Sequence, residues 1–171
     1  MPFTNEDYLP SVEELTVPEL EITSSVFRTA AHHLGKYCDN ASKEYMLCRS
    51  EENDPRKCLN EGKEVTRCGL EFLRKVKKSC FAEFNQYLQC IDHAGSEMEF
   101  KYCRTTQDIY DNCIKENFGQ DRPELGYFAK VRLHKTDRPK PPPLPHILPD
   151  SLPAPPDNYE VTNKRRAFSL S

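Results

Sequence analysis

The sequence lacks the features that mark membrane spans, most enzymes and common cofactor sites. No apolar run approaches the ~20 residues that cross a bilayer, so we expect no transmembrane segment. A Gly-rich phosphate loop, a GxSxG elbow and an HExxH zinc motif are all absent, so we expect no catalytic residue and no cofactor. The motifs CXXCH and CXXC are also absent, which excludes a c-type haem site and a thioredoxin-like site.

Basic residues are missing from the start of the chain. Residues 1–25 contain no Lys or Arg but six acidic side chains, namely Glu6, Asp7, Glu13, Glu14, Glu19 and Glu21. We therefore expect neither an Arg-rich mitochondrial presequence nor a secretory signal. Elsewhere Lys and Arg are mixed with acidic residues along every predicted helix, so nucleic-acid binding is not expected. His32 and His33 would point ~100° apart on a helix, and we interpret them as packing or interface residues.

Cysteines are the chief positive feature. Eight cysteines form four CX9C pairs. Ten residues of helix rise ~15 Å, whereas a disulfide needs its two Cα atoms within ~7 Å, so no pair can close on itself. An antiparallel helical hairpin closes two such bonds over a short loop. The predicted bonds are Cys38 to Cys68, Cys48 to Cys58, Cys80 to Cys113, and Cys90 to Cys103.

Metal binding is the main alternative for these cysteines. A structural zinc site usually takes its thiolates from CX2C to CX4C knuckles, and no two cysteines here are closer than ten positions. A copper chaperone with the same hairpin would need an adjacent Cys-Cys pair to hold Cu(I), and this chain has none. We therefore expect disulfides and no metal.

Apolar residues at helical spacing predict an all-α fold of two disulfide-stapled antiparallel hairpins with extended N- and C-terminal arms. The expected parts are an acidic arm over 1–25, a first hairpin with a leading helix over 26–78, a second hairpin over 79–119, and a proline-rich arm over 120–171. Asp54 and Pro55 predict a helix start, and Ser96 with Glu99 predicts a capping box for the fourth helix. The sequence leaves open whether the second and third helices are continuous.

An aromatic residue lies three positions before the second cysteine in three of the pairs. Tyr45, Tyr87 and Tyr110 take this place, and Val65 takes it in the fourth pair. A spacing of three puts each on the same helical face as its cysteine. Two compatible interpretations remain: core packing beside a disulfide, and an apolar patch that an import oxidase recognises before oxidation.

Prolines gather near the end of the chain. Nine of the fourteen fall between Pro139 and Pro156, which favours an extended polyproline conformation. The segment is either a disordered tail or a strap laid over neighbouring subunits. Candidate anchors for a strap are Leu144, Ile147, Leu148, Leu152 and Tyr159.

Several segments carry a resemblance to a known family. They are Cys48–Cys68 (CRSEENDPRKCLNEGKEVTRC), Ala30-Ala31-His32-His33, Arg122-Pro123-Glu124-Leu125-Gly126 and Thr136-Asp137-Arg138-Pro139. With the four CX9C pairs, residues 10–140 resemble the PGIV-type accessory subunits of mitochondrial respiratory complex I, which have a double twin-CX9C (CHCH) pattern.

The resemblance implies a non-catalytic structural subunit that helps to stabilise and assemble the complex. It implies a place on the intermembrane-space face of the membrane arm, peripheral to the inner membrane. Its partners would be membrane-arm and other accessory subunits and, transiently, the Mia-type import oxidase. Disulfides without an export signal fit the same compartment. A free intermembrane-space CHCH assembly factor of a respiratory complex remains the alternative.

Overall fold

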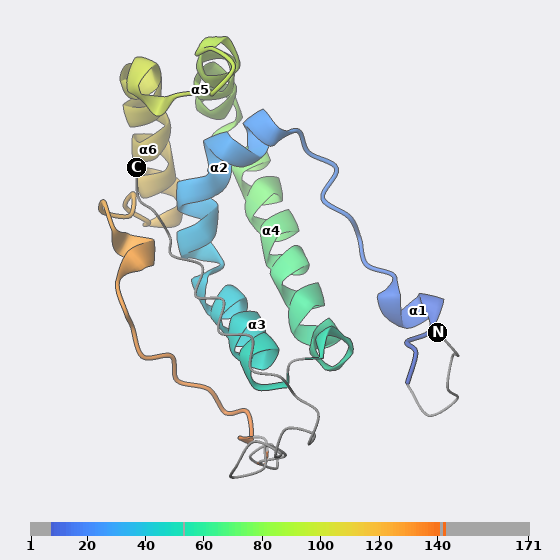
Figure 1. Cartoon of the computed structure of the whole chain (residues 1–171). Coiled ribbons are helices and arrows are strands. Elements are labelled where there is room, and N and C mark those ends of the chain that lie inside the picture. Colours follow the sequence, from blue (N-terminus) through green and yellow to red (C-terminus); the bar gives the residue numbers. More distant parts are fainter. Residues whose placement is uncertain (1–7, 53, 141, 143–171) are drawn as a thin grey trace, which may run out of the picture. The chain divides into compact units, whose positions relative to one another are not determined.

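The computed structural model describes residues 8–52, 54–140 and 142. Residues 1–140 form one compact unit, and residues 141–171 form another that lies almost wholly outside the described residues. The candidate strap anchors from Leu144 to Tyr159 are therefore outside the described part of the chain. The account below concerns the first unit (Figure 1).

Every regular element in the described residues is helical. In chain order these are α1 (Val12–Leu15), α2 (Ser24–Tyr37), α3 (Asp39–Glu52), η1 (Pro55–Cys58), α4 (Leu59–Ser79), α5 (Phe81–His93), η2 (Phe100–Cys103), α6 (Arg104–Phe118) and η3 (Tyr127–Ala129), where η denotes a 3-10 helix. The helices α3 and α4 form the first antiparallel hairpin, α5 and α6 form the second, and α2 packs against both α4 and α5. The predicted all-α fold of two disulfide-stapled hairpins is confirmed.

The helix boundaries follow local chemistry. Asp54 caps the first turn of the second arm of the hairpin by accepting a hydrogen bond from the Arg56 backbone N–H at 3.0 Å, with Pro55 at the first helical position. The question left open by the sequence has a clear answer, because α4 and α5 are separated at Cys80, which has φ −132° and ψ 36°. Gly119, at φ 64°, ends α6 in the left-handed conformation that glycine adopts at low cost.

The predicted capping box at Ser96 is wrong. The helical turn η2 begins at Phe100, its N-cap is Glu99, and no side chain caps it. Residues 94–98 instead form a turn in which Gly95 has φ 92° and Met98 has φ 49°. The left-handed residue at Met98 turns the chain between Ser96 and the helix, so Ser96 lies too far back to cap it.

The N-terminal arm also differs from the expectation of a wholly extended segment. It contains one helical turn, α1, which Ser11 and Glu14 close with a reciprocal capping box. Farther along the arm, Leu20 reaches the hairpins. A Cβ placed on Gly69 of α4 would lie 3.2 Å from the Leu20 side chain, so the glycine provides the space that the leucine fills.

The core lies where α2 meets both hairpins. Its non-cysteine apolar members are Ala30, Leu34, Phe72, Val76, Phe84, Tyr87, Ile91, Tyr110 and Ile114, drawn from α2, α4, α5 and α6. Burial of an aliphatic or aromatic side chain contributes about 1.5 to 3 kcal/mol. The helix α2 thus couples the hairpins, because its buried face belongs to the same core as theirs.

Candidate functional site

The four disulfides fix the scaffold on which every other feature depends. They join Cys38 to Cys68, Cys48 to Cys58, Cys80 to Cys113 and Cys90 to Cys103, with Cα–Cα distances of 5.8 to 5.9 Å. Both sulfur-bearing residues of the Cys48–Cys58 bond are buried, whereas each of the other three bonds includes one partly exposed cysteine. Every described helical hairpin therefore has a bond near its loop and a bond at its open end.

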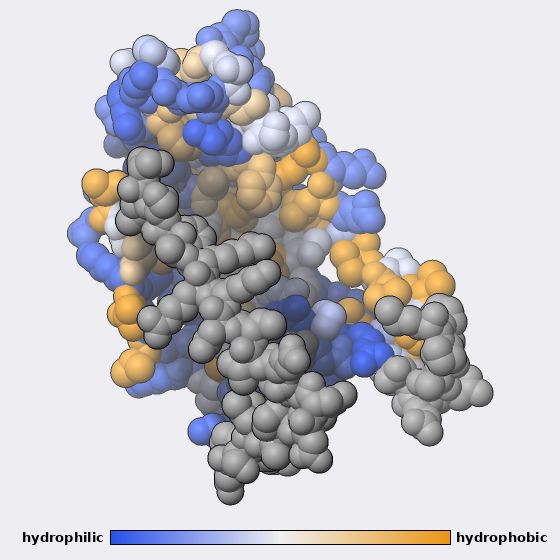
Figure 2. Space-filling view, in the orientation of Figure 1, coloured by the Kyte–Doolittle hydropathy of each residue, from blue (hydrophilic) through white to orange (hydrophobic). Residues whose placement is uncertain are grey.

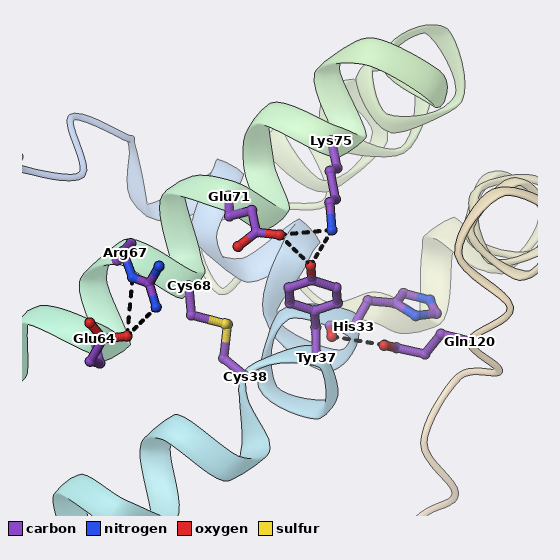
Figure 3. Close-up of a disulfide and its surroundings, with 9 residues drawn as sticks. All are labelled: His33, Tyr37, Cys38, Glu64, Arg67, Cys68, Glu71, Lys75 and Gln120. Carbon is purple, nitrogen blue, oxygen red and sulfur yellow. Dashed lines mark hydrogen bonds and ion pairs between the residues drawn. A yellow bond between two sulfur atoms is a disulfide. The ribbon is translucent and has the colours of Figure 1, made fainter. Parts of the chain in front are cut away.

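A polar cluster lies beside the Cys38–Cys68 bond (Figure 3). The Tyr37 hydroxyl donates to Glu71 Oε1 at 3.0 Å, and Lys75 Nζ donates to the same hydroxyl at 2.5 Å. The hydrogen bonds that Lys75 and Tyr37 donate hold the pKa of Glu71 below its ordinary value. Because these side chains come from α2 and α4, they tie the leading helix to the first hairpin beside its disulfide.

The four predicted import residues occupy different environments. Tyr87 and Tyr110 are fully buried between the helices of the second hairpin, with ring centroids 6.0 Å apart. Burial raises the pKa of both hydroxyls. Tyr45 and Val65 are only half-buried on the first hairpin. In the folded protein, Tyr87 and Tyr110 are thus core residues that an outside partner does not reach.

The adjacent histidines also differ from each other. His33 is buried, and its Nε2 lies 2.7 Å from Asp111 Oδ1 on α6. Arg122 reaches the same carboxylate at 3.2 Å. Burial opposes ionisation of Asp111, but hydrogen bonding to His33 and the charge of Arg122 outweigh it, so the pKa of Asp111 is lowered.

His32 points to a different neighbour, the ring of Phe100, with which it forms an edge-to-face contact at 5.2 Å. Burial, followed by the charge of Arg122, lowers the pKa of His32. The two histidines do not converge on one point, and no group of three or more His, Cys, Asp or Glu side chains in the described ranges is arranged to hold a metal ion.

The segment after α6, expected from the sequence to be only an arm, is bound to α2 and to the first hairpin. We call residues 119–138 the C-terminal strap. At its start Gln120 donates to the His33 carbonyl oxygen at 2.9 Å (Figure 3). Farther on, Phe128 lies against Gly35 of α2, where an added Cβ would be only 2.9 Å from the ring. The Arg132 guanidinium then stacks over Tyr127 at 4.0 Å.

The second half of the strap crosses an acidic surface of the first hairpin. Arg132 pairs with Asp39 at 3.2 Å, and His134 Nε2 lies 2.6 Å from Glu44. Hydrogen bonding to His134 lowers the pKa of Glu44. These contacts join the strap to α3 at two successive points along the helix.

Arg138 makes the last of these contacts. Its guanidinium lies 3.1 Å from Glu52, 3.6 Å from Glu61 and 3.7 Å from Glu51. Glu51 and Glu52 belong to α3, whereas Glu61 belongs to α4. Arg138 therefore bridges both helices of the hairpin close to the Cys48–Cys58 bond.

The sequence holds a short signal for this strap, just before the proline-rich end. Apolar and polar residues alternate from Val131 to His134, and the side chains at even positions from Arg132 to Arg138 contact the hairpin. Alternation of apolar and polar residues is the pattern of an extended segment with two distinct faces, and here it covers four residues. What the pattern cannot reveal is the surface that the even positions meet.

The described surface has several shallow, open grooves. One groove has a volume of about 890 Å³ and is bordered by α2, the turn before η2 and the end of the N-terminal arm, with Leu20, Phe27 and Met98 among its lining residues. In the described parts of the chain, no helix is both long enough and apolar enough to span a bilayer.

Comparisons with known proteins agree on one family. No family model matches the chain. It is 32% identical over 89 residues to NADH dehydrogenase (ubiquinone) 1 alpha subcomplex subunit 8-B of Arabidopsis thaliana, covering 52% of this chain and 82% of that protein. Subunit 8-A of the same plant is also 32% identical over 89 residues, covering 52% and 81%. The 20.8 kDa subunit of NADH-ubiquinone oxidoreductase from Neurospora crassa is 30% identical over 117 residues, covering 66% and 59%.

Proposed function

Because the chain belongs to the family of NADH dehydrogenase (ubiquinone) 1 alpha subcomplex subunit 8, we propose that it is a non-catalytic, structural accessory subunit of mitochondrial complex I. The observation that carries this function is the match over 82% of a named subunit of that complex. The scaffold supports it, because four crosslinks and a strap hold short helices in fixed positions. Such a rigid scaffold suits a protein that acts by contacting neighbouring subunits.

Within the complex, we propose a peripheral position on the intermembrane-space side of the membrane arm. The four disulfides support this side, because such bonds persist in oxidising compartments and not in the reducing matrix. The partners would be membrane-arm subunits and other accessory subunits. By bridging them, the rigid scaffold would stabilise the assembled complex.

We further propose that a Mia-type oxidase closes the disulfides during import, and that Tyr45, Val65, Tyr87 and Tyr110 help it to hold each helix. The burial of Tyr87 and Tyr110 supports an order of events, since they are open to a partner only before the hairpin closes. In import assays, Tyr45→Ala should lower the yield of the oxidase-bound mixed disulfide with little change in folded stability. An unchanged yield for Tyr45→Ala and Val65→Ala would remove this role from the first hairpin.

The function is tested by native electrophoresis of detergent-solubilised mitochondria, followed by detection of this chain. An accessory subunit migrates with complex I, and its depletion lowers the amount of assembled complex. Re-expression of the chain should restore that amount. Migration only as a small free species, with complex I intact after depletion, would overturn the proposal.

A further inference from the structure

The distal half of the C-terminal strap, residues 130–138, presents polar side chains to the protein and apolar side chains to the outside. Between Val131 and Arg138 the polar residues at even positions face the hairpin, whereas the apolar Val131 and Leu133 are 100% and 98% exposed. The inward side chains of Arg132 and His134 are only 30% and 19% exposed. Val131 and Leu133 share one face of the segment and so form an apolar surface that the described part of the protein leaves uncovered.

Ion pairs with the first hairpin hold the strap in this orientation. Arg132, His134 and Arg138 are each paired with carboxylates of the first hairpin, at distances from 2.6 to 3.7 Å. Because successive side chains of an extended segment point to opposite faces, those contacts direct Val131 and Leu133 away from the hairpin. Figure 2 shows hydrophobic patches along the left edge of the molecule, where the strap runs in Figure 1.

Within the described part of the chain, the backbone of this stretch also lacks hydrogen-bond partners. Lys130 donates its N–H to the Gly126 carbonyl, and Arg138 donates its N–H to Thr136 Oγ1. Between them, from residue 131 to residue 137, no backbone N–H or C=O is hydrogen-bonded to a described residue. An extended backbone with free donors and acceptors is a template for an added strand.

We propose that residues 130–138 form a docking strand on which an extended segment of a neighbouring protein subunit pairs by strand addition. The added segment would place apolar side chains beside Val131 and Leu133, since directly opposed cross-strand residues lie ~5 Å apart. It would carry an acidic residue near Lys135, which is exposed and has no ion pair with a described residue. Identifying the neighbour as part of complex I rests on the proposed function.

A membrane surface is the competing occupant for exposed apolar residues next to lysines. The free backbone favours a protein segment, because the hydrocarbon region of a bilayer cannot satisfy the N–H and C=O groups of an extended chain, whereas a strand satisfies them in register. The charged contacts beneath the strap also keep it on the hairpin surface, with its edges open along that surface. Strand addition therefore uses both the free edge and the outward apolar face.

The first experiment removes the outward side chains from the full chain. Mitochondria expressing Val131→Ser with Leu133→Ser are compared with a control pair, Val12→Ser with Met46→Ser, which changes side chains that are 81% and 66% exposed outside the strap. The fraction of the strap variant bound to complex I should fall about tenfold, while the control stays at the level of the unchanged protein. Peptide mapping without reduction should find all four disulfides in both variants.

The second experiment measures whether the backbone amides of the strap are hydrogen-bonded. Amide hydrogen exchange across residues 131–137 should be fast in the isolated oxidised chain and strongly slowed in purified complex I. A photoreactive residue at position 133 should crosslink to one protein subunit. Fast exchange in both states, or crosslinks to lipid only, would overturn strand addition.

The outcomes separate this inference from the proposed function. If the unchanged chain migrates with complex I but the strap variant binds equally well, strand addition is wrong and the accessory role stands. If the unchanged chain does not migrate with complex I, the accessory role itself fails. Loss of binding to cardiolipin-containing vesicles by the strap variant, with complex I binding unchanged, would assign the strap to a membrane surface instead.

Discussion

Single side chains decide how the strap and the second hairpin meet the rest of the protein. Asp111 is the clearest case, because it receives His33 from α2, Gln107 from its own helix and Arg122 from the strap. Its side chain is only 16% exposed. Because the Asp111 carboxylate accepts from three partners where α2, α6 and the strap meet, the stability of these contacts depends on pH.

Asp111 should contribute to acid sensitivity. Its pKa is lowered in the folded protein, so its contribution to stability is present above the unfolded pKa of ~3.9 and is lost as pH falls through the lower folded value. Asp111→Asn should cost about 2 kcal/mol of unfolding free energy at neutral pH. It should also lose less stability than the unchanged protein between about pH 4 and pH 2. Urea unfolding at a series of pH values measures both effects.

His32 provides an internal check on that experiment. Its pKa is lowered by burial, so the unfolded state takes up its proton first, and stability declines as pH falls from about 6.5 toward the folded pKa. His32→Gln should remove this upper part of the pH dependence and leave the part due to Asp111. Parallel pH profiles for Asp111→Asn and the unchanged protein would show that the carboxylate is not linked to folding.

Two glycines allow a matched test of how the strap is seated. A Cβ on Gly35 would lie 2.9 Å from Phe128 of the strap, whereas a Cβ on Gly62 would lie 3.5 Å from Tyr45, an ordinary contact. Both glycines are within helices, so helix propensity alone would favour alanine at either position by up to about 1 kcal/mol of unfolding free energy. We expect that gain for Gly62→Ala. Gly35→Ala should instead loosen Phe128, which faster amide exchange near residue 128 would reveal; equal exchange in both variants would contradict a tight seat.

At the scale of elements, the first hairpin depends on its crosslinks more than the second does. Apart from Cys48, the α3 helix has no buried residue, so its attachment to α4 has little apolar support. The Cys48–Cys58 bond and the ion pairs of Arg138 with Glu52 and Glu61 compensate for this deficit, because each joins the two arms of the hairpin.

Removing the inner bond of the first hairpin should therefore have a large effect. Closing a loop of about ten residues contributes about 3 kcal/mol in the chain-entropy description. Cys48→Ser with Cys58→Ser should lower stability by about that amount and reduce the mitochondrial level of the protein, with indirect loss of complex I. Chemical unfolding and immunoblotting measure the two effects. Normal stability and accumulation would show that the hairpin does not need this crosslink.

At the scale of the whole molecule, the C-terminal strap (residues 119–138) and the proline-rich end (residues 139–171) are expected to have different roles. All strap contacts with the hairpin involve residues up to Arg138, which is the last residue with an ion pair to α3 or α4 in the described range. Residues beyond Pro139 are candidates for contacts with neighbouring subunits, because they are not needed for those pairs.

Truncation after Arg138 tests that division. The shortened protein should keep its four disulfides and its unfolding temperature, since every described strap contact remains. Its retention on complex I should weaken at rising salt or detergent if residues 139–171 hold leucine and tyrosine anchors. Truncation after Gly119 is the contrasting variant, and it should lower stability as well. Retention equal to the full chain under all conditions would show that the proline-rich end is not an anchor.

The sequence by itself determined the fold class, because helix rise and disulfide geometry together permit few arrangements of four CX9C pairs. It also determined helix ends where local chemistry decides, as at Asp54 and Gly119. It failed at Ser96, where a capping pattern competes with a left-handed turn at Met98.

Only the tertiary structure decided where the strap lies and which way Val131 and Leu133 face. The contacts that fix the strap join residues 93, 90 and 86 positions apart, as in Arg132 to Asp39, His134 to Glu44, and Arg138 to Glu52. Alternation along a short segment defines two faces but not which of them is covered. That choice depends on the acidic surface created when α3 and α4 come together, because no local interaction within the strap could bring these charges into register.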